Sequence, residues 1–269
     1  MTVTYNKNTP QVMGIINITP DSFFKDSRCE TKDAILSKIE QFIKEGATIF
    51  DIGACSTRPG SAPVDEKEEM HRMRNALGTI RSAYPDICLS IDTFRASVAR
   101  MSVEEFGAQI INDVYGSDPK MAETVAKLDC SYVFTHSLDV DSSSPEELIR
   151  KIFAFFAEGI KALQEKGARK IIIDPGFGFG KTMDQNFALL SLQQELKSLG
   201  YPLLVGISRK RMIWQTLNIT PEEALNGTTV LNTLSLIAGA DILRVHDVKE
   251  AKQCVDLYTR YYNNKVQND

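Results

Sequence analysis

The fold class is decided by a short apolar run of the form KIIIDP, at residues 170–175, in which three isoleucines lead directly to an aspartate. Seven other runs share its short length, its content of β-branched residues and its abrupt change to polar or loop-forming residues. These are QVMGIIN (11–17), ATIFDIG (47–53), ICLSID (87–92), AQIIND (108–113), CSYVFTH (130–136), PLLVGIS (202–208) and ADILRVH (240–246). The segments between the runs carry apolar residues at helical spacing, as at Ile35, Ile39 and Phe42. This alternation predicts an α/β protein with parallel strands.

Eight alternating strand and helix units are the number that closes a parallel sheet into a barrel. The chain of 269 residues is slightly longer than a typical (β/α)8 barrel and leaves little material for a second domain. We therefore expect a single (β/α)8 (TIM) barrel domain over residues 1–269, in which residues 1–10 form an N-terminal tail.

The connections at the two ends of the expected strands differ. Those from helix to strand are short and carry a glycine that can end a helix in the left-handed conformation. These glycines are Gly46, Gly107, Gly167, Gly200 and Gly239. Those from strand to helix are long and rich in Pro, Gly, Ser and charge, at residues 17–31, 54–65, 113–120, 136–145 and 174–184. The face formed by the long connections is therefore predicted to bind ligands.

Local motifs indicate where two of the helices begin. Residues 144–147 (SPEE) and 220–223 (TPEE) each combine an N-cap hydroxyl, a proline in the first turn and an acid at the third helical position. We expect one helix to start at each motif.

Composition and charge exclude several classes of partner. With 31 basic and 35 acidic residues the formal charge is -4, which disfavours a broad nucleic-acid surface. No apolar run is long enough to span a membrane, and the polar segment MTVTYNKNTP lacks the features of a signal peptide. Five scattered cysteines without a C-x-x-C pair favour free thiols. We expect a cytoplasmic protein that binds neither nucleic acid nor membrane.

Polar residues at the ends of the third, fourth and sixth expected strands could form an acidic cradle. Asp92, Asn112 and Asp174 would offer hydrogen-bond acceptors and one amide to a flat, donor-rich ligand. Each has an alternative structural interpretation, because the aspartates could cap the helices that follow and the asparagine could belong to a turn. The segment at 174–182 (DPGFGFGKT) is not a Walker phosphate loop, since Pro175 stands where that loop requires a glycine.

Basic residues follow the seventh and eighth expected strands, the region where barrels commonly bind phosphate. Lys210, Arg244 and His246 could together hold a diphosphate, and the arginine could pair bidentately or stack on a ring. The structural alternatives are a solvated helix start for Lys210 and its neighbours, and an ion pair within the barrel for Arg244. The role of Arg209 is left open, and His71 is expected to be an exposed residue of a charged helix.

The first two expected loops contain oxygen and cationic groups. Asn17, Thr57 and Arg58 supply an amide oxygen, a hydroxyl and a guanidinium, which suit magnesium and phosphate oxygens better than zinc. The chain has only three histidines and no spaced cysteine pair from which to build a zinc cage. Cys55 has no evident base beside it, and we interpret it as incidental.

Seven short strings, each on a different expected strand, resemble in their order the dihydropteroate synthase family. They are MGIINITPDSF (13–23), DIGACSTRPG (51–60), SIDT (90–93), IINDV (110–114), IDPGFGFGK (173–181), VGISRK (205–210) and LRVHDV (243–248). The match spans nearly the whole chain. The resemblance implies a folate-pathway transferase that joins 6-hydroxymethyl-7,8-dihydropterin diphosphate to 4-aminobenzoate, giving dihydropteroate and diphosphate.

The resemblance also implies the roles of individual residues. The pterin would be bound by Asp92, Asn112, Asp174, Phe179, Gly206, Lys210 and Arg244. The diphosphate would contact Asn17, Thr57, Arg58, Arg244 and His246, with Mg²⁺ bound at Asn17. The aminobenzoate would lie near Phe23, Thr57, Arg58, Pro59, Ser208, Lys210 and Arg211. Arg58, Lys210 and Arg244 would act in catalysis, and the family implies a homodimer.

The sequence departs from the common pattern of the family at several positions. Lys25 replaces an acid in the first loop, Ala54-Cys55 replaces Gly-Glu, Thr135 replaces a methionine that often lies against the pterin, and Arg211 replaces a serine. An arginine at position 211 is able to bind the aminobenzoate carboxylate in place of that serine.

Three other functions share parts of this pattern. A methyltetrahydrofolate-corrinoid methyltransferase-like barrel would use the same acidic cradle but has little need of a diphosphate pocket. An aldolase-type lyase would use Lys210 to form a Schiff base with a carbonyl substrate. A non-catalytic pterin-binding paralogue would bind the substrate without turnover.

Overall fold

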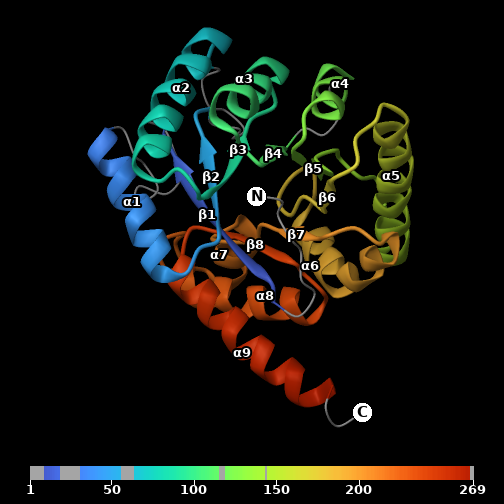
Figure 1. The fold of residues 1–269 in the computed structure, drawn as a ribbon. Helices are drawn as coiled ribbons and strands as arrows, with labels where there is room; N and C mark the ends of the chain where they lie inside the picture. Colours follow the sequence, from blue (N-terminus) through green and yellow to red (C-terminus); the bar gives the residue numbers. More distant parts are fainter. Residues whose placement is uncertain (1–8, 19–30, 56–63, 115–118, 143, 267–269) are drawn as a thin grey trace.

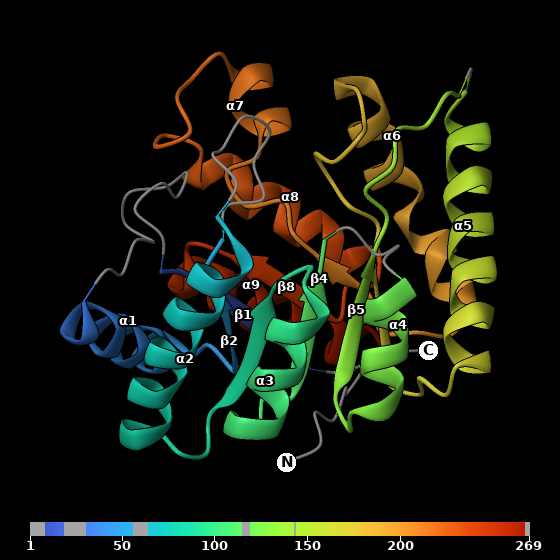
Figure 2. The same ribbon diagram turned by 90° about the horizontal axis from the view of Figure 1, so that it is seen from above.

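The computed structural model describes residues 9–18, 31–55, 64–114, 119–142 and 144–266. Within these ranges helices surround a central set of strands (Figure 1), as the view from above also shows (Figure 2). The strands are β1 (Gln11–Asn17), β2 (Ile49–Gly53), β3 (Cys88–Asp92), β4 (Ile110–Asp113), β5 (Ser131–Thr135), β6 (Ile171–Asp174), β7 (Leu204–Val205) and β8 (Ile242–Val245). The helices are α1 (Lys32–Glu45), α2 (Glu66–Ala83), α3 (Ala96–Phe106), α4 (Pro119–Lys127), α5 (Pro145–Glu165), α6 (Met183–Leu192), the short η2 (Gln193–Leu199), α7 (Arg211–Leu217), α8 (Leu225–Ile237) and α9 (Val248–Val266).

The strands form one parallel sheet in the order β6-β5-β4-β3-β2-β1-β8-β7. The two ends of this order meet through a parallel bridge between Ile173 and Leu203, where the Ile173 amide donates to the Pro202 carbonyl at 2.9 Å. The sheet is therefore closed, and the prediction of a single (β/α)8 barrel is confirmed. Among the described residues, no helix has the length and apolar character needed to cross a membrane.

β7 is shorter than the predicted run at 202–208. Pro202 has no N–H to donate, and the Leu203 amide donates to Asp241 Oδ2 at 2.7 Å rather than to a neighbouring strand. The Asp241 carboxylate, which also pairs with Lys197, therefore fixes the entry to this strand before regular pairing begins.

The inner face of the barrel is apolar at one level and polar at the next. The apolar level packs Met13, Ile49, Ile110, Val133, Ile172, Leu204 and Ile242 against one another. Because strand side chains alternate between the two faces, the residues two positions later also point inward. Five of these positions are polar, namely Asp51, Asn112, Thr135, Asp174 and Arg244, and the other two are Ile15 and Gly206. The apolar plug thus lies directly below a polar level at the C-terminal ends of the strands.

Most helix ends follow from local motifs. The five glycines predicted to precede strands all have positive φ angles, and Ser144 caps α5 by accepting from the Glu147 amide at 3.2 Å. The prediction of a helix start at Thr220 is wrong. Thr220 and Glu223 do bond to each other at 3.0 Å, but α8 begins only at Leu225. The intervening amides donate to carbonyls three residues back, so the segment forms tight turns rather than an α-helix.

We predict opposite effects for two glycines that lie within helices. A Cβ at Gly159 in α5 would lie 2.4 Å from the ring of Phe134 in β5, so Gly159→Ala should destabilise the protein by about 1–3 kcal/mol through overpacking. A Cβ at Gly78 in α2 would lie no closer than 3.7 Å to Phe106, so Gly78→Ala should stabilise by up to about 1 kcal/mol. Urea denaturation of both variants measures the two changes, and equal effects would contradict the close contact of α5 with β5.

Candidate active site

A buried carboxylate that sequence reasoning missed organises the polar level of the barrel. Asp51 lies in the middle of β2 and is fully buried. Its oxygens accept from Ser90 Oγ at 2.6 Å, from Asn112 Nδ2 at 3.1 Å and from Arg244 Nε at 2.7 Å. Asp51 therefore connects β2 to three other strands. In the sequence, Asp51 is marked only as the single charged residue of the run ATIFDIG.

Arg244 joins Asp51 to Asp92, whose Oδ2 accepts from Arg244 Nη2 at 2.6 Å. Burial acts to lower the pKa of Arg244, but the two carboxylates raise it above its ordinary value because they favour the cation. The interpretation of Arg244 as an ion pair within the barrel is therefore correct. The pair nevertheless lies at the C-terminal strand ends, where the ligand-binding face was predicted.

The second oxygen of Asp92 has no hydrogen-bond partner within the described residues. Oδ1 is buried and unpaired, although Oδ2 accepts from Arg244. Burial raises the pKa of Asp92 to about 7, while Arg244 acts to lower it. The alternative in which Asp92 caps a helix is wrong, since the N-cap residue of α3 is Arg95. An orphaned buried acceptor is explained when a ligand or water donates to it.

Asn112 and Asp174 also lie in strands at the barrel rim, and neither caps a helix. Asn112 is buried within β4 and lies opposite Asp92 in the strand register. Asp174 closes β6, and its Oδ1 accepts from the Gly176 amide at 2.8 Å. Burial raises the pKa of Asp174, and Lys210 acts to lower it. The N-cap of the following helix, α6, is Thr182 and not Asp174.

Lys210 reaches toward the same level from the start of α7. Its Nζ donates to the Phe177 carbonyl and lies 4.5 Å from the centre of the Phe179 ring. Burial lowers the pKa of Lys210 to about 8, although Asp174 acts to raise it. Lys210 therefore stands at a helix start, as the N-cap residue of α7, but its ammonium pairs with the protein rather than with solvent alone. Gly206 leaves space beside Arg244, because a Cβ there would lie 3.8 Å from the arginine Cβ.

Ser208 and His246 pair across the ends of β7 and β8. Ser208 Oγ lies 3.0 Å from His246 Nδ1 and accepts from the His246 backbone amide at 3.2 Å. Burial, followed by the nearby cations Arg244 and Arg209, lowers the pKa of His246 to about 3. The imidazole is therefore neutral near pH 7 and can donate through one nitrogen while accepting through the other.

Arg209 and Arg211, on either side of Lys210, differ in burial and in their contacts. Arg209 is 6% exposed and has a φ of 54°. Its Nε and Nη2 each pair with Asp247 at 2.8 Å, and its Nη1 donates to the carbonyls of Pro221 and Glu222. Arg209 therefore anchors the segment before α7 to the turn before α8, which is a structural role. Arg211 is exposed in the first turn of α7.

The ends of β1, β2 and β3 converge at Asn17, Gly53 and Asp92. A Cβ at Gly53 would lie 3.3 Å from Asn17 Oδ1 and 3.5 Å from Asp92 Cβ. Across the ranges that the structure describes, no three His, Cys, Asp or Glu side chains are grouped so as to hold a metal ion. A single amide oxygen fits magnesium, which usually keeps several waters and uses few protein ligands beside substrate phosphates.

A second network that sequence reasoning missed secures the start of α2. Glu69 is fully buried and accepts from Thr93 Oγ1 at 2.6 Å and from the Arg95 guanidinium, which also donates to the Val64 carbonyl. The network ties the chain before α2 to the end of β3, next to Asp92. No local sequence motif predicts this network, because Glu69 lies in α2 whereas Thr93 and Arg95 follow β3.

Some predicted site residues lie outside the described residues, namely Phe23, Thr57, Arg58 and Pro59. Lys25, in the first loop, lies outside them too. Of the described cysteines, Cys55 has a buried thiol, and burial raises its pKa, which disfavours a reactive thiolate. His71 is exposed on α2, as predicted.

Comparison with known proteins agrees with this geometry. The profile of the family described as "Pterin binding enzyme" matches residues 13–246. Dihydropteroate synthase from Bacillus subtilis is 39% identical over 252 residues, covering 92% of this chain and 87% of the relative. The Yersinia pestis dihydropteroate synthase, solved with a sulfonamide drug complex, superposes with a TM-score of 0.88 at 35% identity over 98% of this chain and all of its own. A dihydropteroate synthase from Coxiella burnetii, in complex with pteroic acid, gives a TM-score of 0.86 at 33% identity over 93% of this chain and 92% of its own.

We predict that the His246 imidazole stays neutral in the folded protein down to about pH 5, because its pKa is lowered to about 3. The unfolded chain takes up this proton below about pH 6.5, so the contribution of His246 to stability is complete above that pH and declines as the pH falls towards 3. Ring nitrogen chemical shifts recorded during an acid titration test the protonation state. A folded protein whose His246 ring is already protonated near pH 5 would contradict the assignment.

Proposed function

The chain belongs to the pterin-binding enzymes and is a transferase of the dihydropteroate synthase class, and on this premise we propose that it joins 6-hydroxymethyl-7,8-dihydropterin diphosphate to 4-aminobenzoate. In this reaction the bond from the pterin methylene carbon to the diphosphate oxygen breaks. A bond forms from the same carbon to the arylamine nitrogen, which then loses a proton. The products are 7,8-dihydropteroate and diphosphate.

The observation that carries the pterin assignment is the unpaired Oδ1 of Asp92, whose other oxygen pairs with Arg244 of the buried polar level. Asn112 lies opposite Asp92 in the register, and Asp174 closes β6 two strands beyond Asn112. Carboxylate and amide acceptors arranged in this way suit a flat ring whose edges carry several N–H donors. Each charged hydrogen bond of this kind contributes about 1.5–3 kcal/mol, so rings that lack those donors would be rejected.

The remaining residues of the rim would orient the ring and stabilise charge. Asp174 would accept two parallel N–H bonds from the amidine-like edge of the pterin. Lys210, Phe179 and Gly206 would line its pocket, since the lysine ammonium already faces the aromatic ring. Arg244 would stack on the pterin and reach the phosphates, with Asp51 holding its Nε side in place.

The negative charge of the diphosphate leaving group must be neutralised, and the residues proposed to do so include those at the ends of β1 and β8. Asn17 would hold Mg²⁺, which when bound would neutralise part of the diphosphate charge. His246 is neutral because its pKa is lowered, so it would bind the diphosphate as a neutral N–H donor and not as a cation. Thr57, Arg58 and Arg244 would contact the remaining oxygens. These contacts stabilise the charge that develops as the carbon–oxygen bond breaks.

The second substrate would bind beside the loops. Phe23, Thr57, Arg58, Pro59, Ser208, Lys210 and Arg211 are the positions that correspond to the aminobenzoate site of the family. An arylamine is already nucleophilic at neutral pH, so positioning and exclusion of water matter more than a general base. Sulfonamides, which mimic aminobenzoate, would compete for the same site.

One alternative has a specific observation in its favour. Burial lowers the pKa of Lys210 to about 8, a property that Schiff-base lysines share. Borohydride trapping of Lys210 with a carbonyl substrate would support that lyase chemistry. Methyl transfer from methyltetrahydrofolate would support the corrinoid methyltransferase instead, and binding without product would identify a non-catalytic paralogue.

The central experiment is to incubate the purified protein with the pterin diphosphate, 4-aminobenzoate and Mg²⁺ and to measure dihydropteroate. We predict product from the wild type and a loss of pterin affinity of about tenfold or more in Asp174→Asn, because an amide replaces a charged acceptor. Asp129→Asn is the matched control, since Asp129 is largely exposed before β5. Unchanged calorimetric affinity in Asp174→Asn would refute the role of Asp174.

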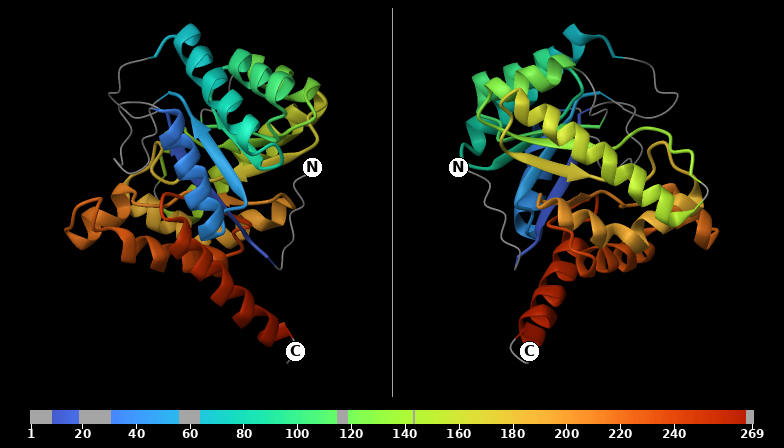
Figure 3. Two further views of the ribbon diagram at one scale, coloured as in Figure 1. Left: turned by 60° about the vertical axis from the view of Figure 1, so that its left-hand side comes forward. Right: turned by 90° about the vertical axis from the view of Figure 1, so that its right-hand side faces the viewer.

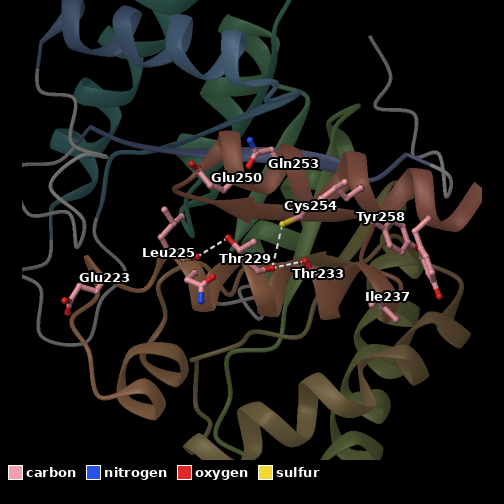
Figure 4. A pocket seen from close by; sticks show the side chains of 12 residues that line it. Glu223, Leu225, Thr229, Thr233, Ile237, Glu250, Gln253, Cys254 and Tyr258 are labelled. Carbon is pink, nitrogen blue, oxygen red and sulfur yellow. Dashed lines mark hydrogen bonds between the residues drawn. The ribbon is translucent and has the colours of Figure 1, made fainter.

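We also infer a cytoplasmic homodimer that uses the face formed by α8 and α9. α8 contains no charged residue, and Val230, Leu234 and Ile237 are exposed along it, beside Leu257 and Tyr261 of α9. A groove of about 730 Å³ lies between the two helices, where Cys254 Sγ donates to the Thr229 carbonyl at 3.7 Å (Figure 4). α9 extends beyond the rest of the molecule (Figure 3). A groove beside an apolar ridge is self-complementary across a two-fold axis, which favours a second copy as the occupant.

We predict that Leu257→Asp shifts the protein from dimer to monomer, because Leu257 is 74% exposed and would place a charge in the interface. Ile43→Asp, at an exposed apolar residue of α1, is the matched control and should leave the dimer intact. Sedimentation velocity measures both. A monomeric wild type, or a dimer that survives Leu257→Asp, would overturn this interface.

A further inference from the structure

The glycine-rich segment after β6 packs directly on the segment after β5. Gly176 has a φ of 71°, and a Cβ there would lie 1.9 Å from the His136 carbonyl oxygen. Gly180 approaches the same segment, since a Cβ there would lie 2.4 Å from the Leu138 carbonyl oxygen. These glycines therefore serve a close contact between two loops, which explains a motif that resembles a phosphate loop without its geometry.

Lys181 places its amino group in this contact, where burial lowers its pKa to about 7 and Asp174 acts to raise it. Its Nζ donates to the carbonyls of His136 at 3.1 Å, Gly176 at 3.0 Å and Phe179 at 2.9 Å, and lies 3.1 Å from His136 Nδ1. The three carbonyls come from both loops. Burial lowers the pKa of His136 to about 4, so its ring is neutral and places no like charge beside the Lys181 amine. A single side chain thus cross-links the two segments.

The turn held by Lys181 also holds Lys210. The Phe177 carbonyl, which lies between two residues bonded to Lys181, accepts from Lys210 Nζ. The Phe179 ring lies 4.5 Å from the same Nζ, and the Phe179 carbonyl accepts from Lys181. The position of Lys210 therefore depends on the shape of a turn whose carbonyls converge on Lys181.

We propose that Lys181 is a positioning residue for the pterin pocket, which cross-links the β5–α5 and β6–α6 loops and thereby sets where Lys210 and Phe179 meet the ring. The proposal rests on the proposed function for the identity of the ligand. The contact between the two loops is independent of the proposed function. Lys181 acts through Lys210 and Phe179 rather than on the substrate itself.

The test compares Lys181→Met and Lys181→Gln with Lys170→Met. Lys170 precedes the same strand at its opposite end and pairs with the exposed Asp129, so its replacement is a matched control. The methionine variant removes the ammonium at similar length. The glutamine variant keeps two N–H donors but shortens the side chain and removes its charge. If thermal unfolding shows that the methionine variant is not folded, the glutamine variant tests the same contact.

The first readout is the rate at which an amine-specific reagent labels Lys210, followed by peptide mass spectrometry without substrate. We expect labelling to accelerate severalfold in both Lys181 variants and to be unchanged in Lys170→Met. Labelling of Lys210 at the wild-type rate in a folded Lys181 variant would overturn the proposal.

The second readout separates the two substrates. We expect the Kd for the pterin diphosphate to rise about tenfold, the equivalent of one charged hydrogen bond, and the KM for 4-aminobenzoate to rise by a smaller factor, because Lys210 is only one of several residues at that second site. Equal loss for both substrates would indicate general disruption and overturn a role in positioning. If the wild type fails to bind the pterin diphosphate while Lys210 labelling still accelerates, the loop contact holds and the proposed function fails.

Discussion

The burial of Arg244 between Asp51 and Asp92 is the constraint on which the rest of the site depends. Removing one partner of a buried ion pair typically costs about 3–5 kcal/mol, because a charge is left without compensation. The three residues come from β2, β3 and β8, so they hold one sector of the barrel closed. The pairing also leaves Asp92 Oδ1 without a hydrogen-bond partner among the described residues, so a donor from a ligand would satisfy it.

The polar level follows from ordinary strand geometry. Apolar residues such as Ile49, Ile172 and Ile242 fill the barrel, and the residues two positions later, Asp51, Asp174 and Arg244, share the same inward face. Burial then separates the ionisation behaviour of these groups. It raises the pKa of Asp92 to about 7 and lowers that of Lys210 to about 8. Acceptors gather along β3 to β6 and cations along β7 and β8, which suits a ring joined to an anionic leaving group.

The sequence predicted the barrel and the strand-end residues because both depend on local periodicity. It failed where partners are distant in the chain. Asp51 and Arg244 are separated by 193 positions, and nothing in ATIFDIG indicates that the aspartate meets an arginine. The sequence left the role of Arg209 open and assigned none to Lys181, and only their carbonyl partners show that both tie loop segments together. The roles of Thr57 and Arg58 depend on the family resemblance, since both lie outside the described residues.

The most direct measurement is a crystal structure of the protein with the dihydropterin bound. The ring should lie on the polar level of the barrel, with one N–H donating to Asp92 Oδ1 and its amidine-like edge facing the Asp174 carboxylate, while Arg244 keeps its contact with Asp51. A pterin bound elsewhere, or one that leaves Asp92 Oδ1 without a donor, would contradict the assignment of this level as the binding site.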